Sequence, residues 1–429
     1  MGSVGKSGGS DFMFDGCDTV DLARKYGTPL YVMSETAIRN RLKELHESFI
    51  DRYPGARAVY ASKAFQTLDI CRLVAAEGLG LDVVSGGELF AARKAGFPMD
   101  AVFFHGNGKT DEELRMAVEL GVGRIVVDNL DELEALDRIA VESGKRLKIL
   151  FRITPGVDSH THEYIATGKL DSKFGIPLDP SVRDAYIGRA LGMKGVDLVG
   201  FHFHVGSQLL DNESHVMAIR IALDFMAELR KDYGFVTREL NLGGGFGVRY
   251  TAKDEPKGFA YFVDAMMAAV SDGCRERGLA TPAIIVEPGR WIVGEAGITL
   301  YTVTSVKEIP GVKTYVAVDG GMPDNPRPAL YGAEYEAIVA NRCGEAGGET
   351  VTIVGKCCET GDILIRDISL PRVRRGDILA VFTTGAYCHS MSSNYNRLPR
   401  PAVVMVRHGT ERLTIRRETY DDLVERELE

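Results

Sequence analysis

Several residues that can do chemistry stand at the ends of apolar runs in this sequence of 429 residues. Lys63 ends the first such run, and Glu287 ends the last. A lysine in an apolar setting can lose its proton and attack a carbonyl carbon. A carboxylate there needs a partner that keeps it charged, such as a protonated pyridine nitrogen. The pair could therefore hold a charged aromatic cofactor; a solvated Lys63 and a salt bridge between Glu287 and Arg290 are the alternatives.

Histidines form a second candidate group. His202 and His204 lie two apart in an apolar run, so their side chains share one face of a strand. His160 and His162 repeat this spacing. A closed metal site needs three or four convergent ligands, and no acid or cysteine accompanies either pair at the usual spacing. We therefore expect no metal, and we favour a ring stacked on a planar ligand over a buried structural histidine.

A glycine run indicates an anion site. Gly243, Gly244 and Gly245 follow an apolar run, and their bare N–H groups can approach a phosphate that any β-carbon would obstruct. Their spacing is not that of dinucleotide folds, and a flexible loop is the alternative. Arg290 adds a permanent cation with a planar fork suited to phosphate or carboxylate.

Eight apolar runs separated by helical patterns predict the elements that position these residues. Continuous hydrophobicity is typical of parallel strands covered on both faces, so we predict a (β/α)8 barrel. Its span of about 235 residues is close to the ~250 typical of this fold. Barrel enzymes place their chemistry where the strands end. The runs are 58–63, 81–85, 101–106, 124–129, 147–154, 198–206, 239–245 and 283–289, and the other polar residues at the expected rim are Asp82, Ser85, His105, Asn107, Arg152 and Ser207.

Beyond the last run, the pattern changes to strands without long helices, which predicts a second, all-β domain of sandwich or Greek-key type. We assign 30–291 to the cofactor-binding barrel, and 11–29 with 292–429 to a discontinuous β domain. The run 29–34 is expected to bridge into the β domain. Residues 1–10 contain mainly glycine and serine and are expected to be a linker introduced by cloning.

Composition narrows the classes of partner and compartment. The net charge is −9, the pI is near 5.6, and no basic cluster stands out, which disfavours nucleic acid and anionic membranes as partners. No apolar stretch approaches the roughly 20 residues that span a bilayer. The seven cysteines contain no C-x-x-C spacing. We therefore expect neither disulfides nor a thiolate zinc site, and a cytoplasmic, reducing compartment.

The residues also resemble a known family, from about Pro29 to Pro401. The strings that carry the resemblance are YASKAF, LGLDVVSGGEL, HGNGKTDEEL, RITPGVDSHTHEYIATGKLDSKFG, FHFHVGSQ, NLGGGFG, EPGR, DNPRPALYGA, KCCETGD and GAYCHSMSSNYNRLPRP. They are similar to the diaminopimelate decarboxylases, within the fold type III pyridoxal-phosphate decarboxylases. The resemblance implies a barrel followed by a β-rich domain, and pyridoxal 5'-phosphate as the cofactor.

The resemblance also implies roles for the residues that bind the cofactor. Lys63 would bind it covalently, His204 would stack on its ring, and Glu287 would keep the pyridine nitrogen protonated. The other positions that the resemblance places around the cofactor are Asp82, Arg152, Ser207, Gly243, Gly244, Gly245, Gly289, Arg290 and Tyr387.

The substrate and the assembly are implied in the same way. Cys358 and Glu359 correspond to a pair that the family contributes from the neighbouring subunit of a homodimer, with Cys358 as the proton donor; Cys357 doubles the cysteine and leaves open which thiol acts. The implied reaction removes CO₂ from the D centre of meso-2,6-diaminopimelate and gives L-lysine, the last step of lysine biosynthesis. The residues implied to bind this substrate are Arg290, Arg327, Tyr331, Glu359 and Tyr387.

Other readings stay open. The substrate could instead be another basic amino acid of the arginine or ornithine type, the reaction could be a racemisation, or the chain could be a non-catalytic relative that binds the cofactor. Phe65 stands where family members commonly have asparagine. The polar, glycine-punctuated segment 155–175 is expected to form a lid over the site.

Overall fold

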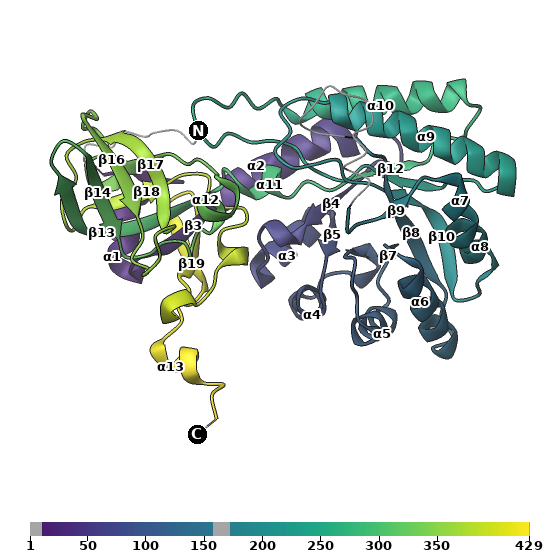
Figure 1. Cartoon of the computed structure of the whole chain (residues 1–429), viewed down its shortest axis with the longest axis horizontal. Helices are drawn as coiled ribbons and strands as arrows, with labels where there is room; N and C mark the ends of the chain where they lie inside the picture. The colour runs from purple at the N-terminus through teal and green to yellow at the C-terminus, as the bar shows by residue number, and fades with distance from the viewer. Residues whose placement is uncertain (1–10, 158–171, 429) are drawn as a thin grey trace. The chain divides into compact units, whose positions relative to one another are not determined.

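The computed structural model describes residues 11–157 and 172–428 (Figure 1). The chain forms two compact units, and we describe each by itself. The barrel unit consists of Lys43–Gly247 and Pro256–Gly289. The β unit consists of Val248–Glu255 and of the described parts of Met1–Leu42 and Arg290–Glu429.

Some features expected from the sequence fall outside the described ranges. They are the linker at 1–10, the pair His160 and His162, and most of the expected lid at 155–175. Within the described ranges, no helix is both long enough and apolar enough to cross a membrane.

Eight parallel strands close into a ring in the barrel unit, which confirms the predicted (β/α)8 barrel. The pairings of β10 with β8 and of β12 with β4 close the ring. Each of the eight predicted runs overlaps one of these strands, and three of the strands begin one or two residues before the run. The eight strands are β4 (Arg57–Ala61), β5 (Gly80–Val83), β6 (Val102–Phe104), β7 (Arg124–Val127), β8 (Leu147–Thr154), β10 (Val196–His202), β11 (Glu239–Asn241) and β12 (Ala283–Val286). A two-residue strand, β9 (Ile176–Pro177), extends β8.

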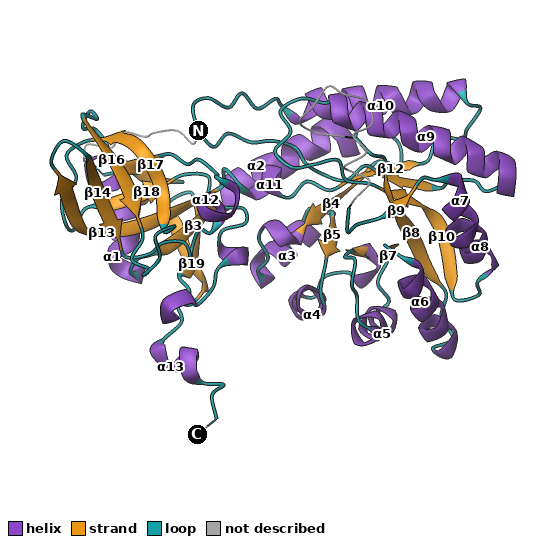
Figure 2. Ribbon diagram, in the orientation of Figure 1, coloured by secondary structure: helices purple, strands orange, loops and turns teal. Residues whose placement is uncertain are grey.

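Helices follow the strands and cover the outside of the ring (Figure 2). Four of them begin directly after a polar residue whose side chain accepts a backbone N–H of the first turn: Thr67, Ser85, Thr110 and Asn129. The last residue of each of these four loops thus caps the helix that follows. The helices of this unit are α3 (Leu68–Ala76), α4 (Gly86–Ala95), α5 (Asp111–Leu120), α6 (Leu130–Glu142), α7 (Pro180–Arg183), α8 (Arg189–Gly192), α9 (Glu213–Tyr233) and α10 (Phe259–Glu276).

Apolar side chains from six of the eight strands fill the barrel interior, as this architecture requires. They are Val59, Phe103, Val126, Leu150, Val199 and Ile285, each at most 3% exposed. The strands approach closely at Gly200, where a Cβ would lie 1.7 Å from the carbonyl oxygen of Glu239. Only glycine fits there.

An ion cluster lies at the opposite end of the strands from the predicted chemistry. Glu239 begins β11, and its Oε1 lies 2.6 Å from Arg124 Nη2 and 2.8 Å from Arg57 Nη2. Burial raises the pKa of Glu239, but the two guanidinium groups outweigh burial and lower the pKa to about 2. These strand starts are therefore tied together by charge.

The β unit contains a nine-stranded sheet, as predicted for the second domain. Its order is β17-β16-β14-β13-β3-β19-β20, and β15 and β18 extend from β13. The strands are β3 (Leu30–Ser34), β13 (Gly297–Ile309), β14 (Lys313–Val318), β15 (Ala337–Val339), β16 (Glu349–Val354), β17 (Ile363–Leu370), β18 (Ile378–Val381), β19 (Ala402–Arg407) and β20 (Thr410–Ile415). A small hairpin, β1 (Met13–Phe14) and β2 (Cys17–Asp18), precedes α1 (Thr19–Tyr26). Helix α2 (Glu35–Leu45) begins in this unit, which also contains three short helices: α11 (Arg290–Val293), α12 (Arg327–Tyr331) and α13 (Tyr420–Val424).

The division into units differs from the bounds expected from the sequence, which gave 30–291 to the barrel. Strand β3 pairs antiparallel with β13 and parallel with β19, and all five of its residues are buried. It is therefore an interior strand of the β unit, into which the run 29–34 was expected to bridge. Residues 248–255 also belong to the β unit.

Candidate active site

Lys63 and an acidic group stand together at the carboxyl ends of the barrel strands. Lys63 lies in a short 3-10 turn directly after β4, and Asp82 lies in the neighbouring strand β5. The Lys63 Nζ is 3.4 Å from Asp82 Oδ2. The Asp82 side chain is 1% exposed and that of Lys63 is 43% exposed, so the carboxylate is buried while the lysine side chain is partly accessible to solvent.

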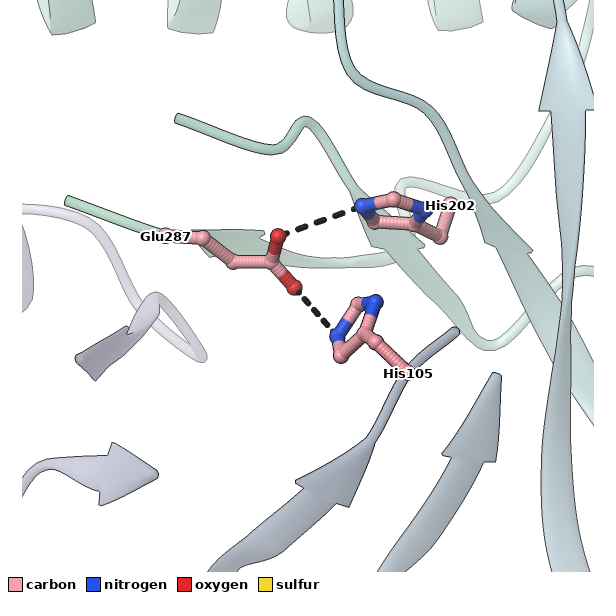
Figure 3. A group of neighbouring side chains, drawn as sticks. All are labelled: His105, His202 and Glu287. Carbon is pink, nitrogen blue, oxygen red and sulfur yellow. Dashed lines mark hydrogen bonds and ion pairs between the residues drawn. The ribbon is translucent and has the colours of Figure 1, made fainter. Parts of the chain in front are cut away.

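The Glu287 carboxylate at the same end of the barrel contacts three side chains, of which Figure 3 shows His105 and His202. Its Oε1 accepts a hydrogen bond from Asn241 Nδ2 at 2.6 Å, and its Oε2 contacts His202 Nε2 at 3.2 Å. His105 Nε2 lies 2.9 Å from Oε1. Burial raises the pKa of Glu287, but the two histidines outweigh burial and hold the pKa well below its usual value. Glu287 is therefore a buried anion.

Burial keeps both histidines of the predicted pair neutral. It lowers the pKa of His202 to about 4. It also lowers the pKa of His204 well below its usual value, and the positive charges of Lys63 and Arg152 add to that shift. His204 Nδ1 accepts the backbone N–H of Gly244 at 3.3 Å, which ties the ring to the glycine loop.

The glycine loop packs tightly against the neighbouring strand ends. A Cβ on Gly244 would lie 2.2 Å from the carbonyl oxygen of Glu287, and one on Gly243 would lie 2.4 Å from that of Phe203. Gly245 and Gly289 are similarly close to Gly206 and Ala61. Close packing alone thus demands glycine at these positions, a reason that the sequence pattern does not reveal. Ser207 nearby is exposed.

Arg152 in β8 is the remaining predicted residue of this end. Burial lowers the pKa of Arg152, while the charges of Asp128, Glu287 and Asp82 oppose the shift. Its guanidinium carbon lies 4.2 Å from the centre of the Phe174 ring. The positive charge of Arg152 therefore interacts with the negative charges of Asp82 and Glu287.

A separate group of arginines and tyrosines forms in the β unit. The guanidinium carbons of Arg290 and Arg327 lie 4.8 Å and 5.6 Å from the ring centre of Tyr387, and Arg327 also lies 5.6 Å from that of Tyr331. Each arginine donates to a buried tyrosine hydroxyl, Arg290 to Tyr250 and Arg327 to Tyr335. The guanidinium groups of Arg290 and Arg327 can bind a carboxylate or a phosphate.

Tyr387 has an unusual backbone conformation, with a φ of 60°. This left-handed region is sparsely populated by residues other than glycine, and such residues gather at functional sites. The contacts between the arginines and the tyrosine rings bring together four residues that the sequence predicted for the site: Arg290, Arg327, Tyr331 and Tyr387.

Cys358 and Glu359 lie in the exposed loop between β16 and β17. The Cys358 backbone N–H donates to Asn396 Oδ1 at 2.8 Å. Cys357 is half-buried, and burial together with the charge of Asp362 raises its pKa to about 12. The exposed thiol is therefore that of Cys358.

Sequence reasoning missed Asn241, Tyr250 and Tyr335, and it gave His105 no role. His105 was placed at the expected rim, but its local sequence does not show that it contacts Glu287. One ring nitrogen of His105, one of His202 and one carboxylate oxygen of Glu287 all lie within 4.8 Å of one another. This spacing alone would admit a metal ion.

Comparisons with known proteins agree with this arrangement. The family described as "Pyridoxal-dependent decarboxylase, pyridoxal binding domain" matches residues 36–294. The diaminopimelate decarboxylase of Bacillus subtilis (strain 168) is 52% identical over 413 residues, which are 96% of this chain and 94% of that protein. The enzyme of that name from Staphylococcus aureus (strain COL) is 42% identical and covers 96% of this chain and 97% of its own.

Solved structures give the same result. The crystal structure of diaminopimelate decarboxylase from M. jannaschii in complex with L-lysine has a TM-score of 0.91 and 37% identity, and covers 98% of this chain and 96% of its own. That of the Helicobacter pylori protein with L-lysine has a TM-score of 0.84 and 31% identity, and covers 95% of this chain and 98% of its own. The chain therefore belongs to the diaminopimelate decarboxylase family of pyridoxal-dependent decarboxylases.

Proposed function

We propose that this chain decarboxylates meso-2,6-diaminopimelate at its D centre, using pyridoxal 5'-phosphate, and releases L-lysine as the last step of lysine biosynthesis. The observation that carries the proposal is the buried, anionic Glu287 at the barrel end where Lys63 presents its amine. Relatives named diaminopimelate decarboxylase, which match this chain over nearly their full length, support the proposal.

The donor set of the barrel end fits this cofactor. An amine can bind an aldehyde, a neutral imidazole can stack on an aromatic ring, and an anion can hold a ring N–H. Asp82 Oδ1 is buried and lacks a hydrogen-bond partner among the described residues, so the site also keeps an unused acceptor. The bound cofactor supplies an electron sink for the electron pair left behind when CO₂ departs.

The residues of this chain would divide the work of holding the cofactor. Lys63 would bind the aldehyde carbon, His204 would cover one face of the ring, and Glu287 would keep the ring nitrogen protonated. Asp82 and Arg152 set the charge around them. The phosphate would be held by Ser207, Gly243, Gly244, Gly245, Gly289, Arg290 and Tyr387.

The second carboxylate of meso-diaminopimelate would distinguish this substrate from amino acids that have only one. The planar fork of Arg327 suits a carboxylate better than a simple diamine tail, and Arg290, Tyr331 and Tyr387 stand beside it in the β unit. Glu359 would bind the distal ammonium group. After CO₂ leaves, the thiol of Cys358 would return a proton to the substrate carbon.

The assembly we propose is a cytoplasmic homodimer in which Cys358 and Glu359 complete the site of the other subunit. Their position in an exposed loop of the β unit supports this arrangement, because such a loop is available to a second copy. A charge of −9 without a basic cluster fits a small-molecule enzyme.

The test is release of CO₂ from a panel of amino acids: meso-diaminopimelate, L-lysine, L-ornithine and L-arginine. We expect release from meso-diaminopimelate, with L-lysine as the product. Lys63→Ala should abolish it, and borohydride should no longer fix the cofactor to the protein, whereas the matched surface variant Lys43→Ala should behave as the native chain. Preference for ornithine or arginine, or fixation that persists in Lys63→Ala, would contradict the proposal.

A further inference from the structure

We infer that His202, with Asn241 and His105, positions the Glu287 carboxylate so that one acceptor site of Oε2 is kept for the ring nitrogen of the cofactor. The inference rests on the proposed function and adds positioning residues to it. All four side chains belong to the barrel unit, and each is at most 5% exposed. Figure 3 shows His202, in β10, and His105, which directly follows β6, converging on the carboxylate.

His202 must donate through Nε2. Its Nε2 lies 3.2 Å from Glu287 Oε2, and its Nδ1 is buried without a hydrogen-bond partner among the described residues. A neutral imidazole carries one N–H, and the hydrogen-bond partner of this ring among the described residues is a carboxylate, which accepts but does not donate. The proton therefore sits on Nε2, and the bare nitrogen is Nδ1.

Asn241 fixes the other oxygen. Its Nδ2 donates to Glu287 Oε1 at 2.6 Å, and its Oδ1 accepts the backbone N–H of Gly243 at 3.0 Å. This second bond sets which way the amide faces. The Glu287 backbone N–H donates in turn to the Gly243 carbonyl at 2.7 Å. Main chain and side chain of Glu287 are thus both tied to the glycine loop.

His105 adds a close polar contact to Oε1. Its Nε2 lies 2.9 Å from that oxygen and 3.8 Å from Asp82 Oδ1, but its N–H is not aligned with either acceptor. The His105 and His202 rings pack edge to face, with centroids 4.7 Å apart. The position of one ring therefore restricts the other.

The Glu287 carboxylate keeps an acceptor site that its neighbours do not use. A carboxylate has about four lone-pair sites. Asn241 and His105 lie at Oε1, and among the described residues only His202 lies at Oε2. One site of Oε2 is thus left for a donor, and the ring N–H of the cofactor is such a donor.

The same proton placement argues against a metal ion between these groups. A histidine that binds a metal through Nε2 carries its proton on Nδ1, and that N–H normally has an acceptor. His202 Nδ1 has none in the described part of the chain. The arrangement is built for a hydrogen bond.

The test compares His202→Gln with His202→Asn. A glutamine amide reaches the place of Nε2 and can still donate to Glu287, whereas an asparagine amide reaches only the place of Nδ1. Each variant is loaded with pyridoxal phosphate labelled with ¹⁵N in the ring, and NMR reports whether that nitrogen is protonated. His46→Asn, a histidine of the same unit that bonds the Glu77 carbonyl, is the matched control.

We expect a protonated ring nitrogen in the native enzyme, in His202→Gln and in His46→Asn. In His202→Asn the signal should move toward the unprotonated value, and kcat should fall about 10- to 100-fold with little change in KM. A protonated nitrogen and a kcat within about twofold of native in His202→Asn, or equal losses in both His202 variants, would overturn the inference. Failure of the native chain to bind the cofactor or release CO₂ would instead contradict the proposed function.

Discussion

The carboxylate of Asp362 fixes the backbone of Cys357, because its Oδ2 accepts the Cys357 N–H at 2.8 Å. Its Oδ1 accepts the N–H of Met322 at 2.6 Å. Met322 lies shortly before α12, which begins at Arg327, and Cys357 precedes Cys358. One buried acid thus links the loop of the proposed proton donor to the loop of the proposed substrate-binding arginine.

Replacing Asp362 with asparagine should loosen that link. The amide offers only one acceptor for two N–H groups, so we expect the free energy of unfolding to fall by about 1–3 kcal/mol. The pKa of Cys357, about 12, should also fall, since the nearby negative charge that helps to raise it is removed. Alkylation of Cys357 at mildly alkaline pH, measured by mass spectrometry in a Cys358→Ser background, should become faster. Asp421→Asn on the exposed helix α13 is the control; an unchanged rate in Asp362→Asn would show that Asp362 does not govern this thiol.

Mixing two inactive variants tests whether active sites are shared. Lys63→Ala and Cys358→Ala, after verified subunit exchange, should recover activity toward about one quarter of native, since half of the dimers are hybrids and each has one intact site. Lys63→Ala mixed with Glu287→Gln should recover nothing, because every subunit then has a damaged barrel. CO₂ release from meso-diaminopimelate is the measurement. Absence of recovery in the first mixture would mean that each subunit supplies its own thiol.

Arg327→Lys should change substrate preference. Lysine keeps the charge but loses the fork that binds both oxygens of a carboxylate, so kcat/KM for meso-diaminopimelate should fall about 10- to 100-fold. The residual rate with L-lysine, which lacks the second carboxylate, should hardly change. The matched control is Arg342→Lys, whose partners are Asp377 and Glu345. Equal losses on both substrates would rule out a role in recognising the distal carboxylate.

Glu239 should make the stability of the barrel depend on pH. Its folded pKa, about 2, lies below the ordinary glutamate value of about 4.3, so its stabilisation is present above about pH 4.3 and is lost as pH falls toward 2. The difference corresponds to about 3 kcal/mol. Urea titrations of Glu239→Gln should show a deficit of that order at neutral pH that shrinks in acid. The exposed variant Glu345→Gln should show no such trend, and a pH-independent deficit in Glu239→Gln would refute the electrostatic account.

The barrel and the positions of Lys63 and Glu287 could be predicted from the sequence because continuous apolar runs identify buried parallel strands, and chemistry in this fold lies where the strands end. The hydrogen bonds that define the site could not be predicted. Asn241 acts on a residue 46 positions away, and its two partners are set by the ring of strands, not by local pattern.

Two further features also depended on tertiary neighbours. Tyr250 bonds Arg290 only because the segment 248–255 leaves the barrel and joins the β unit. The glycines at 243–245 were read as an approach to phosphate, and the structure adds a second reason, which is the carbonyl oxygens packed against them. Local sequence does not record either contact.

The place of β3 in the sheet has a consequence for synthesis of the chain. This strand leaves the ribosome early, yet the strands on its two sides begin at residues 297 and 402. The intervening barrel can be complete while a mostly apolar segment, which is fully buried in the finished sheet, still waits for both of its neighbours. Until the last quarter of translation is finished, that segment is exposed to aggregation, which gives a chaperone a defined stretch to protect.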